Sequence, residues 1–166
     1  THSTSSAASD VYKRQAYKNL NSEFELGSFG AGCGAQGGTM KGGLGSASFK
    51  LSNGITVGAL VAANPVGDAT DDTGRHFWAA PFEIGDEFGG LEAPSGGSYA
   101  KSFKRPELFP LEDRANTTIG IVATDADLTK AQAKRLATSA HDGIARAIVP
   151  SHLPCDGDLI LSLIHI

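Results

Sequence analysis

Residues 116–126 read Asn116-Thr-Thr-Ile-Gly-Ile-Val-Ala-Thr-Asp-Ala126, and this stretch decides the fold class. Val, Ile and Thr at this density are typical of a buried strand. Residues 128–149 follow, and their Ala, Leu and Ile side chains recur at steps of three and four, which predicts a helix with one apolar face. Thr129 and Gln132 match a capping box at its start, and Pro150 ends it. A strand followed by such a helix indicates an α/β layered fold.

A β-hairpin is predicted upstream. Residues 44–51 and 55–64 are both β-prone, and they flank the turn sequence Asn53-Gly54. The second run is apolar on both faces, which predicts a strand covered on both sides of its sheet. Residues 65–115 show no clear period, and a connection of this length is usually functional or mobile.

The two ends of the chain are related through one DNA sequence. Residues 10–15, Asp-Val-Tyr-Lys-Arg-Gln, can be encoded by DNA whose reverse complement encodes Leu-Ser-Leu-Ile-His-Ile, and those are residues 161–166. This pattern is typical of a transposase-based sequencing adapter. We therefore expect residues 1–15 and 161–166 to be adapter-derived, and residues 16–160 to be a fragment of one natural domain.

Composition excludes several classes of function. The chain has 14 Lys+Arg and 18 Asp+Glu, a net charge of −4, and no basic stripe with interleaved aromatics, so nucleic-acid binding is not expected. Cys33 and Cys155 form neither a disulfide framework nor a metal-ligand cluster, so we expect no metal and no cofactor. Free cysteines fit a reducing, cytoplasmic compartment. The apolar tail 159–166 is far shorter than the ~20 residues that span a bilayer, so we expect no membrane partner.

Glycine is concentrated before and within the predicted hairpin. Eleven of the 21 glycines fall between Gly27 and Gly58. Residues 27–38 are typical of a close-approach loop whose backbone N–H groups line a pocket. A phosphate-binding loop is the rival interpretation, but no strand precedes these glycines, no helix pattern follows, and the GK[ST] triplet is missing, so we reject it.

The pair Asn116-Thr117 carries the candidate chemistry. A threonine hydroxyl needs a base to become a nucleophile, and a free α-amine on the same residue serves as that base. The ordinary pKa of an α-amine, ~7.7–8.0, leaves a neutral fraction near pH 7. The pair therefore suits a chain that cuts itself before Thr117 and uses the freed residue as a nucleophile. Two other interpretations stay open on these residues alone: an N-glycosylation acceptor, Asn116-Thr-Thr118, and a plain turn before a strand.

Several blocks in a fixed order resemble one family. The blocks are Gly30-Ala-Gly-Cys-Gly34, Met40-Lys-Gly-Gly-Leu-Gly-Ser-Ala-Ser48, Thr56-Val-Gly-Ala-Leu-Val-Ala-Ala-Asn64, Asn116 to Ala126, Leu128-Thr-Lys-Ala-Gln132, Ala140-His-Asp-Gly-Ile-Ala-Arg-Ala147 and Asp156-Gly-Asp158. Together they resemble the self-processing L-aminopeptidase/D-esterase and β-peptidyl aminopeptidase family, which are hydrolases of the N-terminal-nucleophile type. The resemblance implies a four-layer αββα sandwich, incomplete here.

The resemblance also implies site residues. Cleavage would fall between Asn116 and Thr117, dividing residues 16–160 into an α-chain part (16–116) and a β-chain part (117–160). Thr117 would be the nucleophile. Asn64 would stabilise the oxyanion, although the residues alone favour a strand-end Asn capping the turn before Pro65.

An acidic pair completes the set that the resemblance implies. Asp156 and Asp158 stand where some relatives have a Ser-x-Glu pair near the nucleophile's amine, a departure at both positions. An Asp there accepts a hydrogen bond from the α-ammonium group, whereas the plain interpretation is a solvent-exposed Asp-Gly turn. The implied partners are small peptide, amide or ester substrates, and the processed protomers are expected to form a homo-oligomer.

Other candidates are weaker. His141 and Asp142 are neighbours on one predicted helix and point in different directions, so surface or interface packing is favoured over a triad with Thr117. Cys33 is expected to be a small pocket-lining residue. Two alternatives to the enzyme stay open: a non-catalytic relative of the same sandwich that acts as a binding or structural domain, and a fragment whose exposed sheet edges prevent folding.

Overall fold

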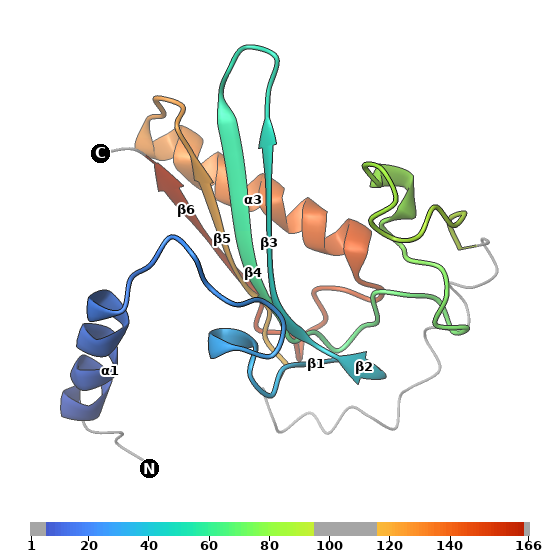
Figure 1. Ribbon diagram of the computed structural model, residues 1–166, viewed down its shortest axis with the longest axis horizontal. Helices are drawn as coiled ribbons and strands as arrows, with labels where there is room; N and C mark the ends of the chain where they lie inside the picture. The colour runs from blue at the N-terminus through green and yellow to red at the C-terminus, as the bar shows by residue number, and fades with distance from the viewer. Residues whose placement is uncertain (1–5, 95–115, 165–166) are drawn as a thin grey trace.

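The computed structural model describes residues 6–94 and 116–164. Its centre is a four-stranded sheet in the order β3-β4-β5-β6 (Figure 1). The strands are β3 (Gly43–Lys50), β4 (Thr56–Ala63), β5 (Ile119–Thr124) and β6 (Leu159–Ile164). The first three pair antiparallel, and β6 pairs parallel to β5.

The predicted hairpin is confirmed as β3 and β4, with Lys50 opposite Thr56. The N–H of Leu51 donates to the Ile55 carbonyl at 2.7 Å, and the N–H of Gly54 donates to the Leu51 carbonyl at 2.9 Å. Gly54 has a φ of +90°, a conformation that the missing Cβ permits. A short loop that closes on a left-handed glycine is a common hairpin connection.

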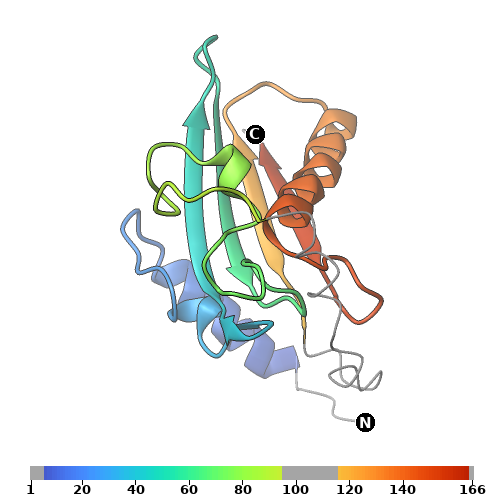
Figure 2. The ribbon, with the colours of Figure 1, turned by 90° about the vertical axis from the view of Figure 1, so that its right-hand side faces the viewer.

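Helix α3 (Lys130–Ala147) crosses one face of the sheet and joins β5 to its parallel neighbour β6 (Figure 2). The predicted capping box is present: the Thr129 side chain accepts from the Gln132 N–H, and the Gln132 side chain accepts from the Thr129 N–H at 2.9 Å. Val122, Ile144 and Ile160 form the buried core between helix and sheet. The strand–helix order predicted from residues 116–149 is therefore confirmed.

The opposite face of the sheet is open within the described residues. Its apolar side chains are half exposed: Ile119 48%, Leu159 48%, Leu161 50% and Leu163 54%. Seven of the eight residues of β4 are only partly buried, so the expectation of a strand covered on both faces is wrong for this part of the chain. The physical reason is that the described residues supply one α layer and one extended β layer, so the layered α/β sandwich is incomplete, as expected.

The glycine-rich segment packs against the start of the hairpin. It contains η1 (Gly30–Gly32), β1 (Gln36–Gly37) and β2 (Met40–Lys41). A Cβ on Gly32 would collide with the Gly27 carbonyl oxygen and the Leu44 nitrogen, so the predicted close approach is real and is made to backbone of the same chain. The irregular segment after β4 contains one short helix, η2 (Ala80–Phe82), and residues 95–115 of that predicted segment lie outside the described residues.

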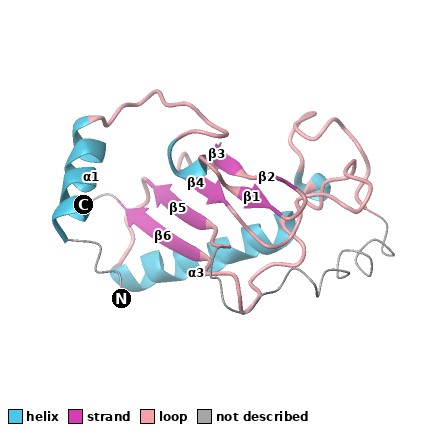
Figure 3. Ribbon diagram, turned by 90° about the horizontal axis from the view of Figure 1, so that it is seen from below, coloured by secondary structure: helices cyan, strands magenta, loops and turns pink. Residues whose placement is uncertain are grey.

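The structure of the chain ends does not test the hypothesis that they are adapter-derived. Helix α1 (Ser6–Lys18) covers much of segment 1–15 and lies to the side of the sheet (Figures 1 and 3). Residues 161–164 complete β6, whose partner strand is β5. The origin of both segments and the domain boundaries stay predictions. Among the described residues, no helix has the length and apolar character needed to cross a membrane.

Candidate active site

The register of the sheet brings the predicted site residues to one end of it. The antiparallel pairing of β4 with β5 ends with Ala62 opposite Ile119, and Asn64 and Thr117 each lie two residues beyond this pair, at the same end of the sheet. On the other side, Asn116 bridges Asp156 in the parallel sense, in the register that pairs Ile119 with Leu159. Thr117 therefore lies between the end of β4 and the segment that enters β6.

The peptide bond before Thr117 is held by the residue between the two aspartates. The N–H of Gly157 donates to the Asn116 carbonyl oxygen at 2.9 Å. A Cβ added to Gly157 would lie 2.5 Å from Thr117 Oγ1, so the Thr117 hydroxyl packs directly against this backbone. Only glycine allows that approach without displacing the hydroxyl. The carbonyl of the predicted cut thus already accepts a hydrogen bond beside the predicted nucleophile.

Asp158 connects Thr118, which leads into β5, to a histidine. Its Oδ1 accepts from the Thr118 N–H at 3.0 Å, and its side chain is 4% exposed. Its Oδ2 lies 2.7 Å from His152 Nδ1, and His152 Nε2 lies 3.2 Å from the His141 carbonyl oxygen on α3. Sequence reasoning missed His152. The only available signal was a histidine six residues before Asp158 in a connecting loop.

Asp156 ties the same loop to the end of β4. Its Oδ1 accepts from the Val66 N–H at 3.1 Å and its Oδ2 from the Leu153 N–H at 2.9 Å. Burial raises the pKa of Asp156 above its ordinary value, and the charge of Asp158 adds to this, against the lowering effect of both backbone hydrogen bonds and of His152. Neither aspartate side chain belongs to a solvent-exposed turn, because Asp156 is half-buried and Asp158 is buried.

Asn64 is held in one orientation at the strand end. Its Oδ1 accepts from the Gln36 N–H at 2.9 Å, across from the glycine-rich segment. This bond fixes the side-chain oxygen, so the Nδ2 group of the amide points away from the Gln36 N–H. The residue stands directly before Pro65, as the plain interpretation also expected.

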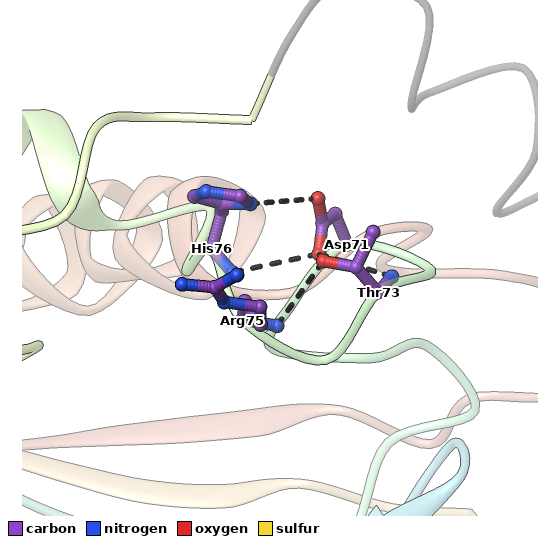
Figure 4. Close-up of polar contacts among 4 residues, drawn as sticks. All are labelled: Asp71, Thr73, Arg75 and His76. Atoms are coloured by element: carbon purple, nitrogen blue, oxygen red, sulfur yellow. Dashed lines mark hydrogen bonds and ion pairs between the residues drawn. The ribbon is translucent and has the colours of Figure 1, made fainter.

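A second buried carboxylate lies in the irregular segment after β4 (Figure 4). Asp71 accepts from Thr73 Oγ1 at 2.6 Å, and its Oδ2 lies 3.1 Å from His76 Nδ1. Burial alone would raise the pKa of Asp71, but hydrogen bonds from Thr73, His76 and Arg75 lower it to about 2. These partners all come from residues 73–76, so the cluster closes its own loop.

An apolar cavity lies between α3 and the sheet, on the face of the sheet that Thr118 lines. It has a volume of about 330 Å³ and is lined by small and branched residues of α3 and the sheet, among them Val61, Gly120 and Ala140. Thr118, 2% exposed, is part of its lining. Thr117 is not among the residues that line this cavity. The cavity and the predicted site are therefore different places.

The weaker candidates have other surroundings. The ring of His141 packs edge-on against His152, with centroids 5.1 Å apart, which agrees with a packing role. Cys33 is exposed, so it does not line the cavity. Within residues 6–94 and 116–164, no group of three or more His, Cys, Asp or Glu side chains is arranged to hold a metal ion.

The sequence profile of peptidase family S58 matches residues 2–164. The chain belongs to peptidase family S58. Among family relatives, an uncharacterized aminopeptidase of Mycobacterium leprae is 45% identical over 140 residues, which cover 83% of this chain and 36% of that protein. A 6-aminohexanoate-oligomer endohydrolase of Kocuria sp. is 28% identical over 152 residues, covering 85% of this chain and 40% of that protein.

Solved structures agree with the S58 fold. A protein from Pyrococcus horikoshii superimposes with a TM-score of 0.59 at 30% identity, covering 90% of this chain and 35% of that structure. A β-aminopeptidase from Burkholderia sp. superimposes with a TM-score of 0.58 at 24% identity, covering 92% and 37%, and supports the fold alone. The chain spans between 36% and 40% of the length of these two sequence relatives.

Proposed function

We propose that this chain is the nucleophile-bearing part of a self-processing S58 aminopeptidase or amidohydrolase. The Asn116–Thr117 bond is cut, and Thr117 at the new N-terminus hydrolyses small peptide, amide or ester substrates. The observation that carries the proposal is the hydrogen bond from Gly157 N–H to the Asn116 carbonyl oxygen, beside the Thr117 hydroxyl. Relatives named as an aminopeptidase and as an endohydrolase support the same class of reaction.

The first stage is self-cleavage. Thr117 Oγ1 attacks the Asn116 carbonyl carbon, and the carbonyl oxygen gains negative charge that the Gly157 N–H stabilises. The hydroxyl proton passes to the amide nitrogen as the C–N bond breaks, which leaves the Asn116 acyl group as an ester on Thr117 and frees the α-amine. Water then hydrolyses the ester and releases Asn116 as a carboxylate. In acyl transfer, one preorganised donor of this kind contributes roughly 10²–10³-fold in rate.

The second stage is substrate hydrolysis. The α-amine of Thr117 takes the proton of its own hydroxyl while the oxygen attacks the substrate carbonyl. The resulting ammonium group gives a proton to the leaving amine, and water clears the acyl-enzyme. An α-amine with a pKa near its ordinary value of ~7.7–8.0 is available as a base at neutral pH.

The neighbouring side chains have distinct roles in this proposal. Asn64, whose Oδ1 is held by the Gln36 N–H, is the side-chain donor to the substrate oxyanion. Asp158 holds the Thr118 N–H next to the nucleophile, and Asp156 ties the Gly157 loop to Val66, two residues beyond Asn64. The two aspartates thus fix the backbone that follows Thr117 and the loop that contacts its hydroxyl.

Intact-mass measurement and N-terminal sequencing of the full-length protein test the proposal. A split after Asn116, with a second chain beginning Thr117-Thr118-Ile119, is the expected result. Thr117→Ala abolishes the split, and the matched variant Thr117→Ser, which keeps a hydroxyl and the amine, retains it. Amides of L-, β- and D-amino acids offered to the split protein then define the substrate class.

Two outcomes overturn the proposal. A normal split in Thr117→Ala removes Thr117 from the role of nucleophile. A folded wild-type chain that stays uncut has no N-terminal amine to act as base, and it identifies a non-processing relative that serves as a binding or structural domain.

A further inference from the structure

His152 lies where two elements meet behind the nucleophile strand. It belongs to the loop that leaves α3 and enters β6, and its ring packs on His141 of α3. Its backbone has a φ of 55°, in the left-handed region that few residues other than glycine adopt. A non-glycine residue stays in this region only when its surroundings hold it there. The contacts of the His152 ring hold the residue in this conformation.

Both ring nitrogens of His152 face acceptors. Nδ1 lies 2.7 Å from Asp158 Oδ2, and Nε2 lies 3.2 Å from the His141 carbonyl oxygen. A neutral imidazole carries one N–H, whereas the imidazolium carries two. One ring therefore bridges two elements, and one of its contacts is to a carboxylate whose side chain is 4% exposed.

The contact continues to the nucleophile strand through the second oxygen of the same carboxylate. Asp158 Oδ1 accepts the Thr118 N–H at 3.0 Å, and Thr118 follows Thr117 directly. When His152 holds Oδ2, rotation of the carboxylate is blocked, and Oδ1 stays aimed at the strand. His152 thus acts on the strand through Asp158.

We propose that His152 is a positioning residue for self-cleavage: its ring, held between Asp158 and the His141 carbonyl oxygen, fixes Asp158, which in turn fixes the Thr118 amide and the hydroxyl of Thr117 against Gly157. This role rests on the proposed function above. It adds a residue that does not touch the reacting atoms, and it gives Asp158 a purpose before the α-amine exists.

The variant His152→Gly tests this role in the full-length protein. Glycine adopts a φ of 55° freely, so the variant removes the ring without straining the backbone. Self-cleavage is expected to slow by about 10- to 100-fold, the effect of losing one charge-assisted hydrogen bond. Hydrogen exchange of the Thr118 amide, followed by NMR on Thr117→Ala protein that stays uncut, is expected to become faster when His152→Gly is added.

Small molecules separate positioning from general loss of structure. Imidazole added to His152→Gly carries an N–H that can donate to Asp158, and it is expected to restore the cleavage rate. 1-Methylimidazole carries no N–H in its neutral form and one in its protonated form, and it is expected to restore less. The second variant, His152→Asn, tolerates positive φ and keeps an N–H donor group, and it is expected to lie between wild type and His152→Gly.

The matched control is the other histidine of equal exposure. His76 pairs with Asp71, and its side chain is 33% exposed, as that of His152 is. His76→Gly is expected to leave both the cleavage rate and the Thr118 amide unchanged.

Each outcome decides the proposal. Slower cleavage with faster Thr118 exchange supports it, and an unchanged Thr118 amide in both His152 variants overturns it. If wild-type protein never splits, the proposed function fails, and Thr118 exchange alone still decides whether His152 positions this strand.

Discussion

Two His–Asp pairs in this chain have the same exposure but connect to different parts of the fold. In each pair the histidine side chain is 33% exposed and the aspartate side chain 4%. Asp71 takes its hydrogen bonds from residues 73–76, whereas Asp158 binds the amide of Thr118, forty positions away in the chain. The difference teaches that burial of a carboxylate does not identify its role. Its role is identified instead by the elements of the fold that its two carboxylate oxygens connect.

The largest expected effect distinguishes Gly157, beside Thr117, from Gly74, in the Asp71 loop. Gly157→Ala puts a methyl group where Thr117 Oγ1 lies, so self-cleavage should slow by about 100-fold or more through lost alignment of the Gly157 N–H and the hydroxyl. Gly74 in the Asp71 loop has a φ of +71° and open space around it. Gly74→Ala should lower the free energy of unfolding by about 1 kcal/mol and leave cleavage unchanged. Time courses on a denaturing gel measure cleavage, and equal rates in the two variants would contradict the geometry at Gly157.

The next effect separates the two aspartates. Asp158→Asn loses the carboxylate oxygen that lies 2.7 Å from His152 Nδ1, and its cleavage should slow by about 10- to 100-fold, as expected for one hydrogen bond to a charged group. Asp71→Asn should instead lower the free energy of unfolding by about 1–3 kcal/mol, because its buried neighbours lose a charged acceptor. Cleavage assays and urea denaturation of both variants give a two-by-two comparison. A cleavage defect in Asp71→Asn would show that the loop reaches the active site.

The elements that carry the site were predictable because their signals are local. The period of residues 128–149 gave α3, and the Asn53-Gly54 turn between β-prone runs gave the hairpin. Once β4 and β5 are paired, Asn64 and Thr117 each lie two residues beyond the last pair, at the same end of the sheet. The position of these two residues therefore follows from short-range patterns together with one pairing.

The roles of the residues after α3 were not predictable. Asp156 and Asp158 stand two positions apart, yet one binds Val66 and Leu153 while the other binds Thr118 and His152. These partners come from different elements, and only the path of the loop into β6 decides them. The loop also determines where His152 lies. Assigning residues 161–166 to an adapter left most of β6, and so its parallel pairing with β5, out of the predicted sheet.

Acid titration tests the comparison because the pKa values of Asp71 and Asp156 are shifted in opposite directions. The pKa of Asp71 is lowered to about 2 in the folded chain, below its ordinary value of 3.8, so its contribution is complete above about pH 4 and is lost as the pH falls towards 2. The corresponding free energy is about 2 kcal/mol. Asp156 has a raised pKa, so its contribution is present at low pH and is lost as the pH rises through that value. Unfolding free energies of wild type and Asp71→Asn from pH 2 to 7 should converge at the acid end. A constant gap would contradict the lowered pKa.

The smallest expected effect lies within the Asp71 loop. Thr73 Oγ1 donates to Asp71 Oδ1 at 2.6 Å, and it is the strongest of the hydrogen bonds that lower the pKa of that carboxyl. Thr73→Ala should lower the free energy of unfolding by about 1 kcal/mol above pH 4. It should also move the acid loss of stability to higher pH, because the carboxylate keeps fewer donors while remaining buried. Thr73→Ser keeps the hydroxyl and should behave like wild type in both respects. An acid limb that does not move in Thr73→Ala would assign the lowered pKa of Asp71 to its hydrogen bonds with His76 and Arg75 instead.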